Sequence, residues 1–290
     1  MKESLVDPHS QLPDEKVCLL SVHRSPPGEA RGDDPVRVLA LHGVTMSGSA
    51  WQEVAPLLPD TWEFVAPTAL GHRGGPLLSG KATITRLVDT AEETIRQSGG
   101  HRWHIVGNSI GGWMALELAR RGHALSVLAI SPAGCWTPGK PDASRATDRL
   151  ISMRKRAKMV APLSLVLMRI PAIRRFAMRD VASHADRLNA RLAIRMVRDL
   201  VECDAADDLL ATTEWEAGFD PPPCPLTFAW GQCDRIFPVE VNGAIARARV
   251  PQARWLDMGD LGHVPMIDDP AFVARTIVEH LQWVTRASTP

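Results

Sequence analysis

The sequence predicts an α/β protein with a mostly parallel β-sheet that has helices on both faces. Short apolar runs of strand length alternate with amphipathic helical segments along most of the chain, and this alternation is typical of a parallel sheet. The alternation stops after Pro138, and residues 140–215 show helical periodicity without a convincing strand. We therefore expect an α/β core in two parts, 1–136 and 217–290, with a helical cap inserted at 137–216.

The elements of the core follow in order. Strands are predicted at residues 36–41, 63–66, 103–106, 125–130, 226–230 and 254–258, after an irregular N-terminal segment with one apolar run at 17–22. Helices are predicted over 51–58, 83–97, 113–121 and 271–284. The helix over 83–97 has apolar residues at helical spacing, and Gly99 and Gly100 end it. The proline-rich segment 221–225 leads from the cap back into the core.

Composition excludes several classes of protein. The 290 residues are 45% hydrophobic and 23% charged with a net charge of zero, so nothing points to a nucleic acid partner. The five cysteines form no CxxC pair, and we expect neither a zinc site nor a disulfide framework. No phosphate loop or dinucleotide motif occurs, and we expect no cofactor. The N-terminus lacks a signal peptide pattern, and no run of eighteen apolar residues occurs. We therefore expect a cytoplasmic protein without a transmembrane segment.

A G-x-S-x-G motif joins a predicted strand to a predicted helix at Gly107–Gly111. A sharp turn of this kind holds the central serine, Ser109, in a strained conformation at the edge of the sheet. The start of the following helix favours negative charge beside the serine. The alternative is a glycine-rich turn with a bystander serine, but the flanking elements favour a nucleophile.

A serine nucleophile needs a histidine base, and the base needs a carboxylate to orient it. Asp234 follows the strand at 226–230, and His263 follows the strand at 254–258 in a glycine-rich loop. Loops after the carboxyl ends of parallel strands are where such sheets place their sites. Rival carboxylates stand in a polar helical stretch of the cap and are less favoured: Asp204, Asp207 and Asp208.

Acyl transfer also needs two backbone N–H groups aimed at the oxyanion. Ile110, directly after the nucleophile, is expected to supply one. Val44 is expected to supply the other, since it follows His42 and Gly43 at the end of the strand at 36–41. The alternative at this position is an ordinary glycine turn with His42 as a packing residue.

With these motifs in order, the chain resembles the α/β-hydrolase superfamily. The matching segments are His42-Gly43, Gly71–Gly74, the elbow at Gly107–Gly112, Gly231–Pro238 and Gly262–Pro265. The resemblance implies an eight-stranded, mostly parallel sheet and a helical cap between strands six and seven. It also implies a Ser-His-Asp triad of Ser109, His263 and Asp234, although this fold hosts many reactions.

The resemblance leaves several reactions open. Haloalkane dehalogenases and epoxide hydrolases use an aspartate nucleophile, which Ser109 argues against. Hydrolases of ring-cleavage products share the Gly-Asn-Ser-x-Gly-Gly elbow, but many have tryptophan directly after the catalytic histidine, where this chain has Val264. Hydrolysis of a carboxylic ester of a small molecule is the broadest fit. Carbon–carbon bond hydrolysis of a diketone, a non-catalytic ligand receptor and a cofactor-independent oxygenase are the alternatives.

The cap is strongly basic. Residues 140–198 contain fifteen Lys and Arg against four Asp and Glu, beside apolar residues at helical spacing. This pattern suggests a preference for an anionic substrate, or a basic amphipathic face that touches a membrane surface. The third interpretation is a solvated helical face.

Overall fold

The structure is a computed structural model that describes residues 20–22, 35–139 and 141–287. Its centre is a seven-stranded sheet in the order β1-β3-β2-β4-β5-β6-β7. The strand bounds are Leu20–Val22 (β1), Arg37–Leu41 (β2), Glu63–Ala66 (β3), Trp103–Asn108 (β4), Ala124–Ile130 (β5), Leu226–Trp230 (β6) and Arg254–Asp257 (β7). All neighbouring pairs are parallel except β1 with β3, which is antiparallel. The predicted fold class is confirmed.

The sheet has fewer strands than the eight expected. Within the described residues a single antiparallel strand, β1, precedes the parallel series. The polar N-terminal segment contains one apolar run, at 17–22, and the part of that run beyond β1 lies outside the described residues. One short apolar run is enough for one edge strand, which fits the smaller count.

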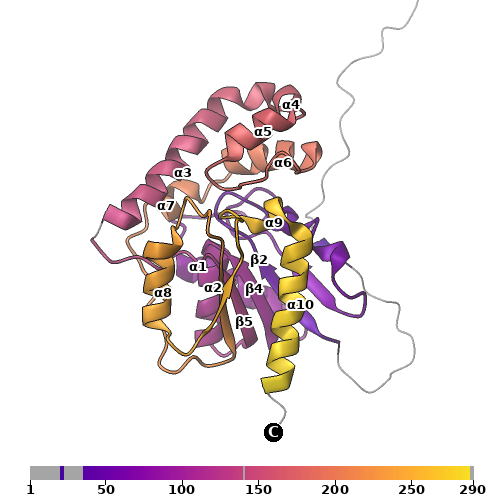
Figure 1. The fold of residues 1–290 in the computed structure, drawn as a ribbon, viewed down its shortest axis with the longest axis vertical. Coiled ribbons are helices and arrows are strands. Elements are labelled where there is room, and N and C mark those ends of the chain that lie inside the picture. The colour runs from indigo at the N-terminus through magenta and orange to yellow at the C-terminus, as the bar shows by residue number, and fades with distance from the viewer. Residues whose placement is uncertain (1–19, 23–34, 140, 288–290) are drawn as a thin grey trace, which may run out of the picture.

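Helices cover both faces of the sheet (Figure 1). The core helices are α1 (Ile84–Gln97), α2 (Ile110–Arg120), α8 (Ala244–Arg249), α9 (Pro265–Asp268) and α10 (Pro270–Ala287). α1 and α2 pack together on one face, and α10 packs against β5 from the other. Thr83 starts α1 as predicted, because its hydroxyl accepts a hydrogen bond from the Arg86 N–H at 3.3 Å.

The helix predicted over 51–58 is wrong in type. Two short 3₁₀ turns occupy this region, η1 (Gly48–Trp51) and η2 (Ala55–Leu57). Pro56 lacks the N–H that an α-helix would need at that position, so the chain cannot continue a regular helix through it. Trp51 and Val54 are nevertheless fully buried, so the apolar spacing identified the packed side chains correctly.

The cap stands above the carboxyl ends of the strands, between β5 and β6 in the chain (Figure 1). Its elements are α3 (Pro141–Val160), η3 (Ala161–Leu163), α4 (Ser164–Leu167), α5 (Pro171–Met178), α6 (Ala190–Val201) and α7 (Ala206–Leu210). All of them fall inside the range 137–216, although the exact division into core and cap stays a prediction. No helix among the described residues is long and apolar enough to cross a membrane.

Candidate active site

The turn between β4 and α2 holds Ser109 in the left-handed region, with φ 56° and ψ −119°. A non-glycine residue adopts such a conformation at an energetic cost that the surrounding structure must offset. The flanking glycines are required by space: a Cβ on Gly107 would lie 2.1 Å from the Gly111 carbonyl oxygen, and one on Gly111 would lie 2.3 Å from that of Leu41. The motif therefore builds the sharp turn that the sequence predicted.

Asp234 and His263 form a buried hydrogen-bonded pair. The Nδ1 atom of His263 lies 2.9 Å from Oδ2 of Asp234, and both side chains are almost fully buried. The other carboxylate oxygen, Oδ1, accepts the N–H groups of Ile236 at 2.9 Å and Phe237 at 2.8 Å. With both oxygens engaged, the carboxylate is fixed, and it favours the tautomer that carries a proton on Nδ1. The Nε2 atom of His263 is then left as the basic nitrogen.

The loop that carries His263 is held by two residues that sequence reasoning missed. Asn108, next to the serine, donates from Nδ2 to the His263 carbonyl oxygen at 2.8 Å. Asp268 accepts the Gly262 N–H at 2.7 Å and the N–H of His184, a cap residue, at 2.7 Å. Asn108 belongs to the elbow motif, but the motif does not show that its side chain binds the His263 loop. No local pattern marks the buried Asp268 as a residue that holds this loop.

The predicted site residues come together at the carboxyl edge of the sheet. Ser109, His263 and Val44 line one cavity, whereas Asp234 lies behind His263 and Ile110 starts α2 beneath the serine. Within the described part of the chain, no hydrogen bond joins the Ser109 hydroxyl to His263. Such contacts are often loose without a substrate and tighten when one binds.

The loop of Val44 is fixed by His42. The His42 Nε2 accepts the Ala69 N–H at 2.9 Å, which leaves Nδ1 to donate to the Gly43 carbonyl oxygen at 2.8 Å. Burial lowers the pKa of His42 to about 3, and the neighbouring His72, with ring centroids 5.0 Å apart, adds to the shift. His42 is thus a neutral residue that orients the loop, while the first N–H groups of α2, including that of Ile110, lack intrahelical partners.

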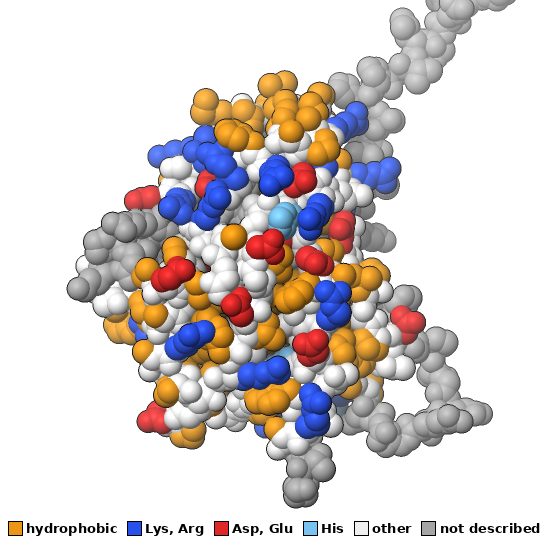
Figure 2. Space-filling model, in the orientation of Figure 1, with side chains coloured by type: hydrophobic (Ala, Val, Ile, Leu, Met, Phe, Trp, Pro, Cys, Tyr) orange, Lys and Arg blue, Asp and Glu red, His pale blue; other side chains and the backbone are white. Residues whose placement is uncertain are grey.

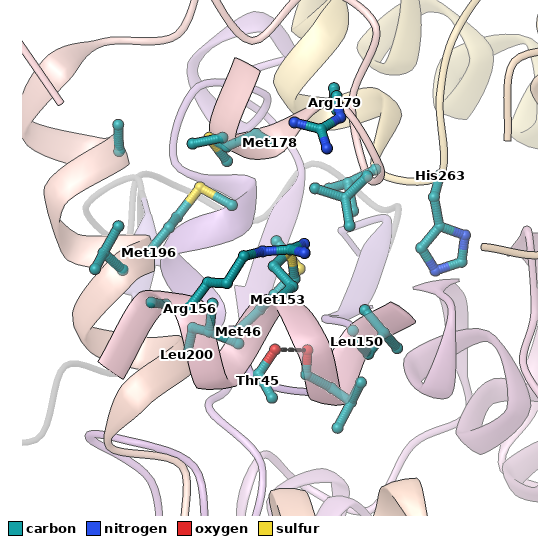
Figure 3. Close-up of a pocket in the computed structure, with 18 of the residues that line it drawn as sticks. Thr45, Met46, Leu150, Met153, Arg156, Met178, Arg179, Met196, Leu200 and His263 are labelled. Atoms are coloured by element: carbon teal, nitrogen blue, oxygen red, sulfur yellow. Dashed lines mark hydrogen bonds between the residues drawn. The ribbon is translucent and has the colours of Figure 1, made fainter. Parts of the chain in front are cut away.

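The cavity has a volume of about 250 Å³ and lies between the core and the cap (Figure 3). Most of its wall is apolar and flexible, with five methionines: Met46, Met153, Met168, Met178 and Met196. Two cationic side chains, Arg156 and Arg179, also line it, and Figure 3 shows Arg156 extending across the cavity. Among the described residues, no Asp or Glu lines this cavity.

A buried carboxylate connects the cap to the core. Asp199 of α6 accepts the Ser47 hydroxyl at 2.6 Å and Nη1 of Arg73 at 3.1 Å. Burial raises the pKa of Asp199, and the bonds from Ser47 and Arg73 oppose that shift. Because Met196 and Val197 of the same helix line the cavity, Asp199 sets where that wall stands relative to the core.

Among the described residues, no cluster of three or more His, Cys, Asp or Glu side chains could hold a metal ion. Cys135 and Cys203 are free and buried, and burial raises the pKa of Cys203 to about 11. A thiol with so high a pKa is a poor nucleophile at neutral pH, so neither residue competes with Ser109.

Comparison with known proteins shows which family the chain is similar to. A family model described as the alpha/beta hydrolase family matches residues 38–276. The epoxide hydrolase EphH of Mycobacterium tuberculosis is 28% identical over 200 residues, which cover 68% of this chain and 94% of that protein. A pimeloyl-[acyl-carrier protein] methyl ester esterase of Aromatoleum aromaticum is 27% identical over 252 residues, 80% of this chain and 93% of that protein.

Solved structures show the same fold. A thermophilic esterase from Thermogutta terrifontis superposes with a TM-score of 0.66 at 22% identity, covering 86% of this chain and 90% of that one. The 2-hydroxy-6-oxo-6-phenylhexa-2,4-dienoate hydrolase of Rhodococcus sp. strain RHA1 also gives 0.66, at 15% identity, covering 86% of this chain and 91% of that one. The sheet, the elbow and the matched sequence lead to one conclusion: the chain belongs to the alpha/beta hydrolase family.

Proposed function

We propose that the protein is a serine hydrolase that cleaves a carboxylic ester of a small molecule through an acyl-enzyme. The observation that carries the proposal is the buried Asp234–His263 pair beside the strained Ser109, with serine and histidine on the wall of one cavity. A pure ligand receptor has no need for this arrangement of nucleophile, base and orienting acid.

The reaction follows from these positions. The Ser109 hydroxyl attacks the ester carbonyl while Nε2 of His263 takes its proton, and Asp234 stabilises the imidazolium that forms. The N–H groups of Val44 and Ile110 hold the oxyanion of the tetrahedral intermediate. His263 returns the proton to the leaving alcohol. A water molecule, deprotonated by His263, then releases the acid and restores Ser109.

The cavity suggests the kind of ester. Its methionine-rich wall suits an acyl chain, and Arg156 and Arg179 suit a substrate that also carries a negative charge. The similarity to pimeloyl-[acyl-carrier protein] methyl ester esterases supports an acyl ester. The similarity to EphH does not favour epoxide hydrolysis here, because epoxide hydrolases use an aspartate where this chain has Ser109. No carboxylate of the described residues lines the cavity.

Carbon–carbon bond hydrolysis is a second candidate. The elbow Gly-Asn-Ser-Ile-Gly-Gly favours it, because hydrolases of ring-cleavage products share this pattern. Val264, which follows the proposed base, lines the cavity where many of those enzymes have a tryptophan. Ester hydrolysis therefore remains the better supported of the two.

Initial rates on p-nitrophenyl esters of increasing chain length test the proposal, with wild type beside Ser109→Ala. We expect kcat/KM to fall by roughly three to six orders of magnitude in the variant, because the nucleophile is lost. A carboxylate-bearing ester and a neutral ester of equal length form a matched pair: only the anionic ester should lose kcat/KM as salt rises. If wild type turns over no ester but cleaves a vinylogous diketone, the second candidate replaces the first.

A further inference from the structure

The outer end of the cap exposes large apolar side chains. Seven of the twelve exposed large hydrophobic side chains in the described part of the chain fall between residues 159 and 176. Six of them form what we name the apolar crest: Met159, Leu163, Leu165, Val166, Ile170 and Phe176. Met159 is 80% exposed and Phe176 is 69% exposed. Figure 2 shows hydrophobic side chains gathered at the end of the molecule where Figure 1 places α4 and α5.

This clustering differs from ordinary surface exposure. Single exposed hydrophobic residues are common on soluble proteins, and Leu77 and Trp215 are examples here. A contiguous apolar patch is uncommon and marks an interaction surface. The crest is built by three short consecutive elements, η3, α4 and α5, and by the end of α3. These elements expose apolar side chains of a kind that a helical bundle would bury in its core.

Basic side chains surround the crest. Six exposed Lys and Arg lie between residues 155 and 179, and we name them the basic collar: Lys155, Arg156, Lys158, Arg169, Arg175 and Arg179. No Asp or Glu occurs in the sequence between residues 149 and 179. Asp180 is the acidic neighbour of the collar, at 3.7 Å from Arg156. Blue side chains lie directly beside the apolar end in Figure 2. The surface thus combines an apolar tip with a positive rim.

The crest and the collar continue into the cavity. Phe176 belongs to the crest, Arg156 and Arg179 belong to the collar, and all three line the cavity that reaches Ser109. Arg179 also packs over the Phe176 ring, with its guanidinium carbon 4.2 Å from the ring centroid. Whatever covers the crest therefore lies against the entrance of the candidate active site.

We propose that the apolar crest and basic collar dock the protein on the surface of an anionic lipid bilayer. Apolar side chains that enter the headgroup layer, beside Lys and Arg that meet lipid phosphates, are the combination by which amphipathic surfaces bind membranes. The crest is a protruding tip (Figure 2), and a fluid lipid surface adapts to a tip, whereas a protein partner would need a matching groove. The proposal is independent of the ester chemistry.

Flotation with lipid vesicles tests the proposal. Wild type should bind vesicles of phosphatidylcholine with 30% phosphatidylglycerol, bind pure phosphatidylcholine at least tenfold more weakly, and lose affinity as salt rises. Val166→Glu and Leu163→Glu change the crest at two residues that do not line the cavity. Each should weaken binding roughly tenfold or more, because an exposed aliphatic side chain that would enter the lipid is lost and a negative charge is added. Lys158→Glu with Arg169→Glu should remove the preference for the anionic lipid.

Matched variants away from the cap separate docking from general surface effects. Leu77→Glu replaces a 92% exposed leucine, and Lys81→Glu replaces an exposed lysine outside the cap; both should bind as wild type does. Ser109→Ala should also bind fully, so a failure of the catalytic proposal would not affect this result. No binding of wild type to anionic vesicles would overturn the proposal, as would equal losses in the crest and control variants. Binding only to an acidic protein, or self-association abolished by Val166→Glu without vesicle binding, would assign the crest to another partner.

Discussion

The candidate active site in the core and the outer end of the cap hold their polar groups in opposite ways. In the core, Asp234 and Asp268 use both carboxylate oxygens, and His42 uses both ring nitrogens, in hydrogen bonds with buried or half-buried groups. At the outer end of the cap, the basic collar and the apolar crest are exposed to solvent, and three of their side chains also line the cavity: Arg156, Phe176 and Arg179. The difference teaches that the proposed chemistry is placed where several hydrogen bonds fix the position of each side chain. The proposed recognition is placed where exposed side chains can still change their conformation.

Several polar contacts join the two regions, and two of them lie near the cavity. Asp199 binds Ser47 and Arg73 of the core, and the Val264 N–H donates to the Val181 carbonyl oxygen at 2.8 Å. The second contact lies beside His263, so the cap helps to position the loop of the proposed base. Changing one region at a time separates chemistry from recognition.

The largest effect should come from the core. Asp234→Asn removes the carboxylate that fixes the His263 tautomer, and we expect kcat on a good ester substrate to fall by about 10³- to 10⁴-fold. The free energy of binding a substrate-like inhibitor should change little, because Asp234 does not line the cavity. Steady-state kinetics and inhibitor titration measure the two quantities.

A rival carboxylate serves as the control. Asp204 stands in the polar stretch of the cap where the sequence left an alternative acid open, and it is exposed. Asp204→Asn should keep kcat within about twofold of wild type. A loss in Asp204→Asn as large as that in Asp234→Asn would contradict the assignment of the acid.

An intermediate effect should come from the contact between the regions. In Asp199→Asn one of the two carboxylate oxygens becomes an NH2 group, so Ser47 or Arg73 loses its acceptor. We expect the free energy of unfolding to fall by about 1–3 kcal/mol. KM should rise more than kcat falls, because α6 supplies part of the cavity wall. Urea unfolding and ester kinetics measure both changes.

Glu202→Gln is the matched control for Asp199→Asn. Glu202 accepts a hydrogen bond from the same Arg73, at 2.9 Å, but its side chain is 56% exposed. Because exposed ion pairs contribute little, the free energy of unfolding should change by less than about 1 kcal/mol. Equal losses in the two variants would show that burial of Asp199 is not what matters.

The sequence predicted the turn of Ser109 and the loops of Asp234 and His263 because their signals are local. Gly107 is required by its close contact with Gly111 and Gly112 inside the turn, and the loops of Asp234 and His263 directly follow predicted strands. The contact between Asp199 and Ser47 spans 152 positions, and no local pattern pairs a buried carboxylate with a distant hydroxyl. The helix predicted over 51–58 is wrong because Pro56 lacks the N–H of a regular helix, which apolar spacing does not reveal. The role of Asp268 also depends on tertiary packing, since its partner His184 belongs to the cap.

The smallest effect concerns pH and again lies in the core. Burial lowers the pKa of His280 to about 3, with His104 and Arg254 adding to the shift, while an unfolded histidine has a pKa of about 6.5. Below pH 6.5 the unfolded state therefore binds more protons than the folded state, and stability falls as pH falls. The slope from one such histidine approaches about 1.4 kcal/mol per pH unit.

His280→Gln should reduce the dependence of the unfolding free energy on pH by up to about 1.4 kcal/mol per pH unit. Urea unfolding at pH 7, 6 and 5 measures it, and the buried His42 and His72 should supply part of what remains. His101→Gln, at an exposed position, should leave the slope unchanged. An unchanged slope in His280→Gln would mean that the histidine is not held neutral in the folded protein.

The hydrogen bond from Asn108 to the His263 carbonyl oxygen joins residues 155 positions apart. The proposed oxyanion loop at Val44 lies still further towards the N-terminus. Contacts of such sequence separation form late, because the intervening chain must first be ordered. A nascent chain can therefore complete the elbow around Ser109 long before β7 brings His263 to it. Hydrolytic activity in a translation reaction would then appear abruptly, once the last strand has joined the sheet, and would report complete folding rather than the presence of the nucleophile.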